Sequence, residues 1–89
     1  MVKIKELVRA GSSIPGAIRE VLSQNDLSIA AFCDKYDRNR QNMSMVFGGT
    51  RGPAQGDVDA LISELGGTDL EWREMLHEAG RPTSVKAVS

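Results

Sequence analysis

Helix-stopping residues recur at short intervals along the 89-residue chain, and they leave room only for short helices. The sequence is divided into short segments by Gly11, "QND" at 24–26, the Asp37–Arg38 turn, the Gly48–Gly49 pair, the Gly66–Gly67 pair and Pro82. Within each segment the apolar residues lie three or four positions apart, which is the spacing of a helix with one buried face. No alternating run is long enough to indicate a strand. The sequence therefore predicts an all-α fold.

Capping residues set the expected helix starts. A stripe of Ile4, Leu7 and Val8 indicates one or two helical turns that end near Gly11. Five further helices are expected: from a Ser12 or Ser13 cap to the "QND" at 24–26, over 29–36 after Ser28, over 39–47 with Asn39 as cap, from Asp57 to Gly66, and from a Thr68–Glu71 capping box to Gly80.

The chain is long enough for one hydrophobic core and too short for two. We expect a single domain over residues 13–80, preceded by an arm or short helix at 1–12 and followed by a flexible tail at 81–89. The apolar residues expected to face the core are Ile14, Ile18, Val21, Leu22, Ala31, Phe32, Cys33, Met43, Val46, Phe47, Val58, Leu61, Ile62, Leu65, Trp72, Met75, Leu76 and Ala79.

Several classes of chemistry lack the residues that they need. The single Cys33 cannot form an internal disulfide, and with the single His77 it cannot make a metal cluster. No nucleophile is placed beside a base, and no glycine loop follows a strand to hold phosphate. We expect a protein that is not an enzyme and has no cofactor. The absence of a long apolar run or signal-peptide pattern indicates a cytoplasmic location, without membrane contact.

Charge is distributed unevenly along the chain, although the net charge is only −1. Residues 1–53 hold eight basic and five acidic side chains, whereas residues 54–80 hold seven acidic side chains and one arginine. The tail adds Arg81 and Lys86. Such asymmetry is compatible with one face that meets phosphate and another that is turned away from it.

Residues 37–53, "DRNRQNMSMVFGGTRGP", gather two arginines, two asparagines and a glutamine at the start of one expected helix. Amide and guanidinium groups make paired hydrogen bonds to flat polar edges, and base pairs have such edges. Only Asp37 and Arg38 separate this helix from the one before it. Two short helices joined by so tight a turn, the second opening with polar side chains, are typical of a helix-turn-helix.

The stretch "LSIAAFCDKYDRNRQNMSMVFGGTRGP", residues 27–53, resembles the core of the Cro and phage-repressor family, of the xenobiotic-response-element type. It matches the family pattern without a gap, and the likeness extends over about residues 14–79. The matching residues are Leu27 and Ser28 at the helix opening, Phe32 and Tyr36 as apolar anchors, Cys33 at the small position, Met43 and Val46 as aliphatic positions, and then Gly49 and Pro53. The resemblance implies a five-helix lambda-repressor-like domain.

Three departures from the family pattern affect its local chemistry. Asp37 replaces the usual turn glycine, and aspartate tolerates the left-handed backbone region better than most residues. Ile29 stands where many members have a glutamine that contacts phosphate, so that contact is not expected. Leu22 and Phe47 replace a buried Arg–Glu pair of some members, and an apolar contact there avoids the desolvation of two charges.

The resemblance implies a sequence-specific regulator of transcription, such as a repressor, whose helix 39–47 enters the major groove of double-stranded DNA. By position, base edges would be contacted by Arg40, Gln41, Ser44 and Met45. Phosphates would be held by Ser28, Arg38, Asn39, Asn42, Thr50 and Arg51. Plainer roles remain open: Arg38 and Arg40 as solvated charges, Asn39 as chiefly a cap, and Asn42 as a solvated amide.

Family members usually bind near-palindromic operators as homodimers. The expected dimer surface is the last helix, through Trp72, Met75 and Leu76, although Trp72 could equally belong to the core. An alternative function is a protein-interaction module, antitoxin-like or regulatory, that grips a protein partner through the helices of residues 57–79. A plain structural bundle is the third possibility. Lys3, Lys5 and Arg9 indicate either a DNA-contacting arm or a solvated helix face.

Overall fold

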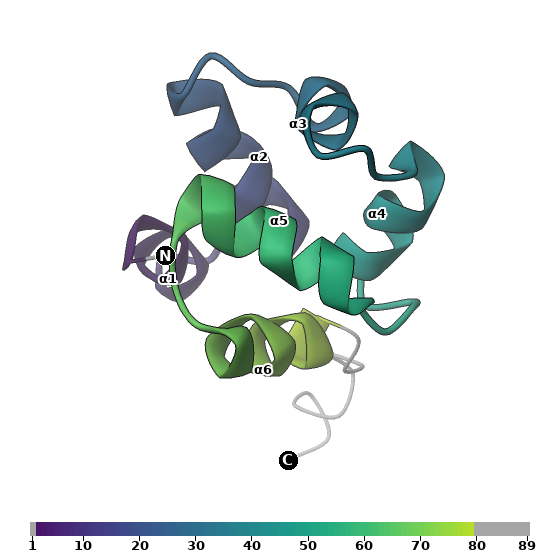
Figure 1. The fold of residues 1–89 in the computed structure, drawn as a ribbon. Helices are drawn as coiled ribbons and strands as arrows, with labels where there is room; N and C mark the ends of the chain where they lie inside the picture. The colour runs from purple at the N-terminus through teal and green to yellow at the C-terminus, as the bar shows by residue number, and fades with distance from the viewer. Residues whose placement is uncertain (1, 80–89) are drawn as a thin grey trace.

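The computed structural model describes residues 2–79, and the regular structure within that range consists of α-helices without strands (Figure 1). Its six helices are α1 (Val2–Arg9), α2 (Ile14–Gln24), α3 (Ile29–Lys35), α4 (Arg40–Phe47), α5 (Gln55–Leu65) and α6 (Asp69–Ala79). The predicted all-α class and the extra N-terminal helix are confirmed. The expected stop at Gly80 and Pro82 and the expected tail lie outside the described residues.

Three helices begin at the predicted capping residues. The hydroxyl Oγ of Ser13 accepts a hydrogen bond from the Gly16 N–H at 3.1 Å. Ser28 Oγ accepts from the Ala31 N–H at 3.0 Å, and Asn39 Oδ1 accepts from the Asn42 N–H at 2.9 Å. Each bond satisfies a backbone donor that has no partner within its helix, and it stabilises that helix by about 1 kcal/mol.

The start of α5 was predicted two residues too late. The helix begins at Gln55, so Asp57 is its third residue and not its cap. From that position Asp57 Oδ2 accepts a hydrogen bond from the N–H of Ala54, at 3.0 Å. A carboxylate in the third helical position can reach back to the capping residue in this way. Asp57 therefore marks the correct helix end, but from inside the helix.

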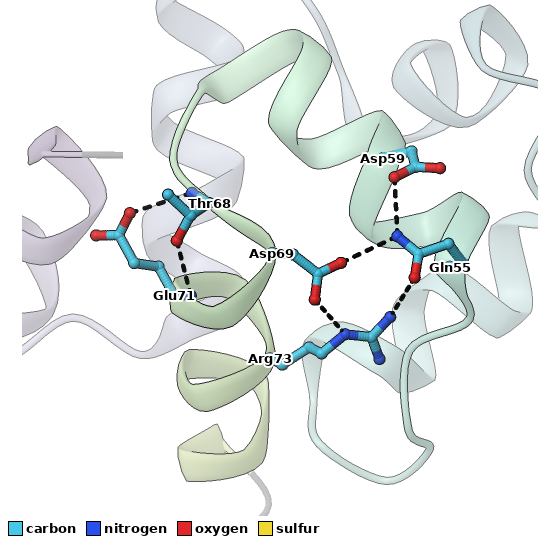
Figure 2. A network of polar contacts seen from close by, with 6 residues as sticks. All are labelled: Gln55, Asp59, Thr68, Asp69, Glu71 and Arg73. Carbon is cyan, nitrogen blue, oxygen red and sulfur yellow. Dashed lines mark hydrogen bonds and ion pairs between the residues drawn. The ribbon is translucent and has the colours of Figure 1, made fainter.

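The capping box of α6 is confirmed. The Thr68 N–H donates to Glu71 Oε1 at 3.1 Å, and the Glu71 N–H donates to Thr68 Oγ1 at 3.2 Å (Figure 2). Beside it, Gln55 in the first turn of α5 bonds to Asp69 and to Arg73 of α6. These polar contacts fix the beginning of α5 against the first two turns of α6.

The predicted core forms between all six helices. The largest fully buried side chains are Trp72, Phe32, Phe47, Ile4, Ile18, Leu22, Met43 and Leu61. Leu22 and Phe47 thus lie in one apolar core, as the sequence predicted, and Cys33 is a buried core residue. Ile62, Met75 and Ala79 are only partly buried and line the border of the core. Ala31, also predicted to face the core, is likewise only partly buried.

Trp72 belongs to the core and not to an exposed dimer surface. Its side chain is 0% exposed, and its indole Nε1–H donates to the Gly66 carbonyl oxygen at 2.7 Å. Leu76 is 2% exposed. Of the three residues expected to form a dimer contact, only Met75 therefore offers surface to a partner.

The first helix docks on the rest of the protein. Ile4 is fully buried, and α1 packs mainly against α2. Lys3 Nζ donates to Gln24 Oε1 of α2 at 2.9 Å, and Lys5 forms an ion pair with Glu71 of α6. These contacts occupy both lysines, so residues 2–9 are a packed helix with a solvated face and not an extended arm. None of the helices within residues 2–79 is long and apolar enough to cross a membrane.

Candidate nucleic-acid interface

The connection between α3 and α4 is only four residues long and is held by its own backbone. The Arg38 N–H donates to the Cys33 carbonyl at 2.7 Å, which folds the chain back at the end of α3. Asp37 adopts φ 55°, the left-handed conformation expected of the residue that replaces glycine. The turn therefore sets the direction of α4, which lies beside α3 and across α5 from α1 (Figure 1).

The outer face of α4 is polar because its apolar residues all turn inward. Met43, Val46 and Phe47 are buried at 1% exposure or less. Successive helical residues are about 100° apart around the axis, so the side of α4 opposite this stripe carries Gln41 and Met45. The residues predicted to contact bases are all exposed: Arg40, Gln41, Ser44 and Met45.

Three of these four side chains, those of Gln41, Ser44 and Met45, have no charged partner in the described part of the chain. The side chain of Gln41 makes no hydrogen bond to any residue within 2–79, and it is exposed, so the oxygen and the nitrogen of its amide both face solvent. Met45 is 37% exposed, one of the large apolar side chains that the described surface leaves open. Ser44 lines a shallow hollow between α4 and the helices α2 and α3. The outer face of α4 thus offers donors, acceptors and an apolar group together.

Arg40, the fourth residue, is bound by a carboxylate on α3. Its Nε–H donates to Asp34 Oδ1 at 3.3 Å, and its Nη2 donates to Asp34 Oδ2 at 2.6 Å. The two side chains are 62% and 63% exposed, so the pair lies on the surface. The hydrogen bonds to Asp34 raise the pKa of the Arg40 guanidinium further above its ordinary value, so the group stays charged.

Four of the six predicted phosphate contacts come together in one hollow beside α4, which we call the two-arginine hollow. It is lined by Arg38, Asn39, Asn42, Arg51, Gly52, Ala54 and Asp57. Arg51 Nη1 donates to Asn42 Oδ1 at 2.7 Å and so ties the loop after α4 to the helix. The remaining donors of Arg51 face solvent, where an anion can reach them.

Arg38, in the two-arginine hollow, forms an ion pair with Asp57 of α5. Its Nε–H donates to Asp57 Oδ1 at 2.9 Å, and the two side chains are 30% and 9% exposed. The guanidinium packs over Gly56, where a Cβ would collide with it. Neither of the roles expected for Arg38, a phosphate contact or a solvated charge, includes this contact. Arg38 joins the turn before α4 to the start of α5.

A second hollow lies on the other flank of α4, and we call it the serine hollow. Its lining consists of Arg19, Ser23, Asp26, Leu27, Ser28, Ile29 and Ser44. Ser44 and Asn42 are two positions apart in α4, about 200° around the axis, so the two hollows lie on different sides of the helix. Ser28, predicted to contact phosphate, and Ser44, predicted to contact a base, thus line the same hollow. Ile29 packs partly into the core, as expected of an apolar replacement.

Arg19 is the residue that the sequence did not identify. It lies on α2, where its spacing gives no sign that it borders α4, and only the packing of α2 against α3 and α4 brings it to the serine hollow. It forms no ion pair within residues 2–79. Thr50 remains exposed, with its N–H donating to the Met45 carbonyl at 2.9 Å, so its hydroxyl borders the end of α4.

The other basic side chains near this surface form ion pairs with carboxylates, and Lys35 is an example. Lys35 Nζ donates to Glu64 Oε1 at 2.7 Å, and the Tyr36 hydroxyl donates to the same oxygen at 2.9 Å. These bonds, the Lys35 bond above all, lower the pKa of Glu64. Burial, followed by the bond to Glu64, raises the pKa of Tyr36, which keeps the phenol protonated. The contacts fix α3 against α5. Within residues 2–79, Arg19 and Arg51 are left as the guanidinium groups around α4 without a carboxylate partner.

Two further observations concern metal ligands and the thiol of the described residues. No group of three His, Cys, Asp or Glu side chains in residues 2–79 could hold a metal ion. Burial raises the pKa of the Cys33 thiol, which keeps it protonated and unreactive. Comparisons with models of protein families, with curated proteins and with solved structures found no match to this chain.

Proposed function

We propose that this protein is a small transcriptional regulator of the Cro and phage-repressor type, which binds double-stranded DNA with α4 in the major groove. One observation carries the proposal: α4 presents an exposed polar face, directly after a tight turn, between two hollows. Each hollow contains an arginine that has no carboxylate partner among the described residues 2–79. Recognition of a duplex needs base-reading groups in the middle and phosphate-binding groups on both sides.

The size and chemistry of α4 suit a major groove. A groove about 12 Å wide admits one α-helix, whose diameter with side chains is about 10–12 Å. Gln41 can make paired hydrogen bonds to adenine N6 and N7, while Met45 can pack on a thymine methyl group. Arg40 and Ser44 would contact the neighbouring base edges.

The two hollows would hold the DNA backbone on either side of the groove. In the two-arginine hollow, Arg51 and Asn42 would bind one phosphate, with Asn39 at the helix start and Thr50 in the loop beside them. In the serine hollow, Arg19 would bind another phosphate together with the hydroxyls of Ser28 and Ser44. Arg38 would act indirectly, since Asp57 already holds it, and would keep the first hollow in shape.

Two copies would bind a near-palindromic operator as a homodimer. On α6 the burial of Trp72 and Leu76 moves the proposed contact to the groove between α1 and α6. Met75, Val8 and Ile14 form its apolar floor, and Lys5 and Glu71 lie at its edge. A basic helix beside an acidic helix is a surface that can complement its own twofold copy.

Selection from a random pool of duplex DNA tests the proposed function. The full chain is incubated with the pool at low salt, and bound DNA is recovered and sequenced over several rounds. We expect a near-palindromic sequence whose half-sites are about 10 base pairs apart. Retention of no DNA, or retention without any enriched sequence, would overturn the proposal.

A protein-interaction module is the second candidate, and the same α1–α6 groove supports it. Glu74 adds an acidic group beside its apolar floor, which suits a basic partner segment. A gel shift with random duplex DNA at low salt separates the two functions. A DNA-binding protein shifts the duplex under these conditions, whereas a module that acts only on proteins leaves it unshifted.

A further inference from the structure

The Asp34–Arg40 pair lies at the centre of the proposed DNA-binding surface, yet stability alone gives little reason for it. Both side chains are largely exposed, and exposed ion pairs contribute little to folding because water screens them. The pair joins the last turn of α3 to the first residue of α4, across the turn that directs α4. Its position therefore indicates that Asp34 orients the guanidinium of Arg40 for its contact with a base.

The geometry of the pair leaves the part of Arg40 that reads bases unoccupied. A guanidinium carries five N–H donors in a rigid plane. Asp34 takes the side edge, through Nε and Nη2. The terminal edge, formed by Nη1 and the second N–H of Nη2, keeps two parallel donors. Because both carboxylate oxygens are engaged, the plane of the guanidinium is fixed while this terminal edge stays open.

We propose that Asp34 is a specificity-determining residue, which holds the guanidinium of Arg40 in one plane so that its terminal edge reads a guanine in each half-site. This inference rests on the proposed function. Asp34 itself is a positioning residue, since it acts through Arg40 and contacts no base in this arrangement.

Guanine is the base that fits two parallel donors. Its major-groove edge presents two acceptors, O6 and N7, whereas adenine presents one acceptor and a donor, thymine one acceptor, and cytosine a donor. A fixed guanidinium meets the wrong bases with at least one unsatisfied or repelled N–H. A mobile one can turn to a single acceptor or to a nearby phosphate. Fixing the plane therefore sharpens discrimination more than it raises affinity.

The charge of Asp34 works in the same direction. A carboxylate close to the DNA surface is repelled by phosphates, so it weakens binding to every sequence alike. That cost is offset only where Arg40 finds guanine, and such a penalty on the wrong partners is a known route to specificity. Loss of Asp34 should therefore raise binding to random DNA and at the same time relax the choice of base.

Asp34→Asn tests the proposal, with Asp37→Asn as its matched control. An asparagine keeps one acceptor but turns an N–H toward Nη2, which breaks the two-point contact. Asp37 lies three residues further on, in the connection between α3 and α4, and it is exposed. Its side chain bonds to no residue within 2–79, and asparagine tolerates its positive φ. Each variant removes one negative charge from the same region, but only the first releases Arg40.

The readout is competition binding on the sequence selected by the parent protein, with each base pair substituted in turn. We expect both variants to bind random DNA somewhat more tightly than the parent. Only Asp34→Asn should reduce the preference for guanine, by roughly tenfold, at the one position where Arg40→Ala removes it. Asp34→Ala, which removes both acceptors and leaves Arg40 intact, should relax the same position and serves if Asp34→Asn does not fold.

The results distinguish a failure of the Asp34 role from a failure of the proposed DNA-binding function. If the parent protein enriches no sequence, the proposed function fails and the role of Asp34 fails with it. If the parent enriches a sequence and Asp34→Asn keeps the full preference at the Arg40 position, only the role of Asp34 is overturned. Equal relaxation by Asp37→Asn would likewise contradict it, because the effect would then come from charge alone.

Discussion

Asp57 performs two tasks with one carboxylate. Its Oδ2 accepts from the Ala54 N–H at the start of α5, and its Oδ1 accepts from Arg38 Nε at the turn before α4. The first bond is local and could be anticipated from a carboxylate near a helix start. The second joins residues 19 positions apart, and no local pattern indicates it. A single side chain thus couples the helix start of α5 to the turn that directs α4.

We predict that Asp57→Ala destabilises the protein strongly for a single substitution. It removes the acceptor of the Ala54 N–H and leaves the half-buried Arg38 guanidinium without its partner, which together should cost about 2 kcal/mol. Chemical denaturation measured by circular dichroism gives the free energy of unfolding. Asp59→Ala is the control, because Asp59 is an exposed aspartate on the same helix. If the two variants unfold alike, the Asp57 contacts do not stabilise the protein.

At the scale of elements, the sequence predicted the helices well because their signals are local. Caps at Ser13, Ser28 and Asn39 and the box at Thr68 fix where helices begin, and each depends on residues only three positions apart. Periodicity fixed which face of α4 turns inward. The start of α5 was missed because a carboxylate in the third position resembles a cap in sequence.

The candidate surface was predictable only where it depends on one helix. Exposure of Arg40, Gln41 and Ser44 follows from the apolar stripe of α4. The Asp34 partner of Arg40 and the approach of Arg19 from α2 depend on how helices pack, which neither spacing nor composition encodes. The burial of Trp72 has the same origin, since an apolar stripe does not show how much of it a small core will cover.

Two substitutions at Asn39 separate its cap from its proposed contact with phosphate. Asn39→Ala removes the acceptor of the Asn42 N–H and should cost about 1 kcal/mol of stability. Asn39→Asp keeps an acceptor in the cap, so stability should stay close to that of the parent. Its negative charge faces the DNA backbone and should weaken DNA binding. Thermal unfolding and a gel shift measure the two effects.

Each Asn39 outcome is decisive on its own. Retention of full stability in Asn39→Ala would show that the hydrogen bond to Asn42 does not stabilise α4. Unchanged DNA affinity in Asn39→Asp would place the residue away from phosphate. Asn25→Asp is a useful control for the charge, because Asn25 follows α2 and lines neither of the two hollows beside α4.

At the scale of the whole molecule, internal pairing limits the charge that is available to DNA. Arg38, Arg40 and Lys35 each contact a carboxylate, and the acidic side chains gather on α5 and α6. Arg19 and Arg51 remain as the cations proposed to meet phosphate directly. A nearly neutral protein can still bind DNA in this arrangement, but its affinity should depend more on base contacts than on counterion release.

The salt dependence of binding should therefore be shallow. With two such arginines in each half of a dimer, about four phosphates are neutralised, and the slope of log affinity against log salt should be about −4. Titrations of the selected operator at several salt concentrations measure it. Arg51→Ala should make the slope shallower by about 2 in the dimer. A slope twice as steep for the parent would mean that many more cations meet the backbone.

Whether the outer face of α4 reads DNA is tested by the binding of Arg40→Ala and Gln41→Ala to the selected operator and to its single-base variants. We predict that each substitution loses discrimination at one base pair, by about 1–3 kcal/mol, that the two base pairs differ, and that the melting temperature stays near that of the parent. If both variants discriminate between bases as the parent does, the outer face of α4 does not read DNA.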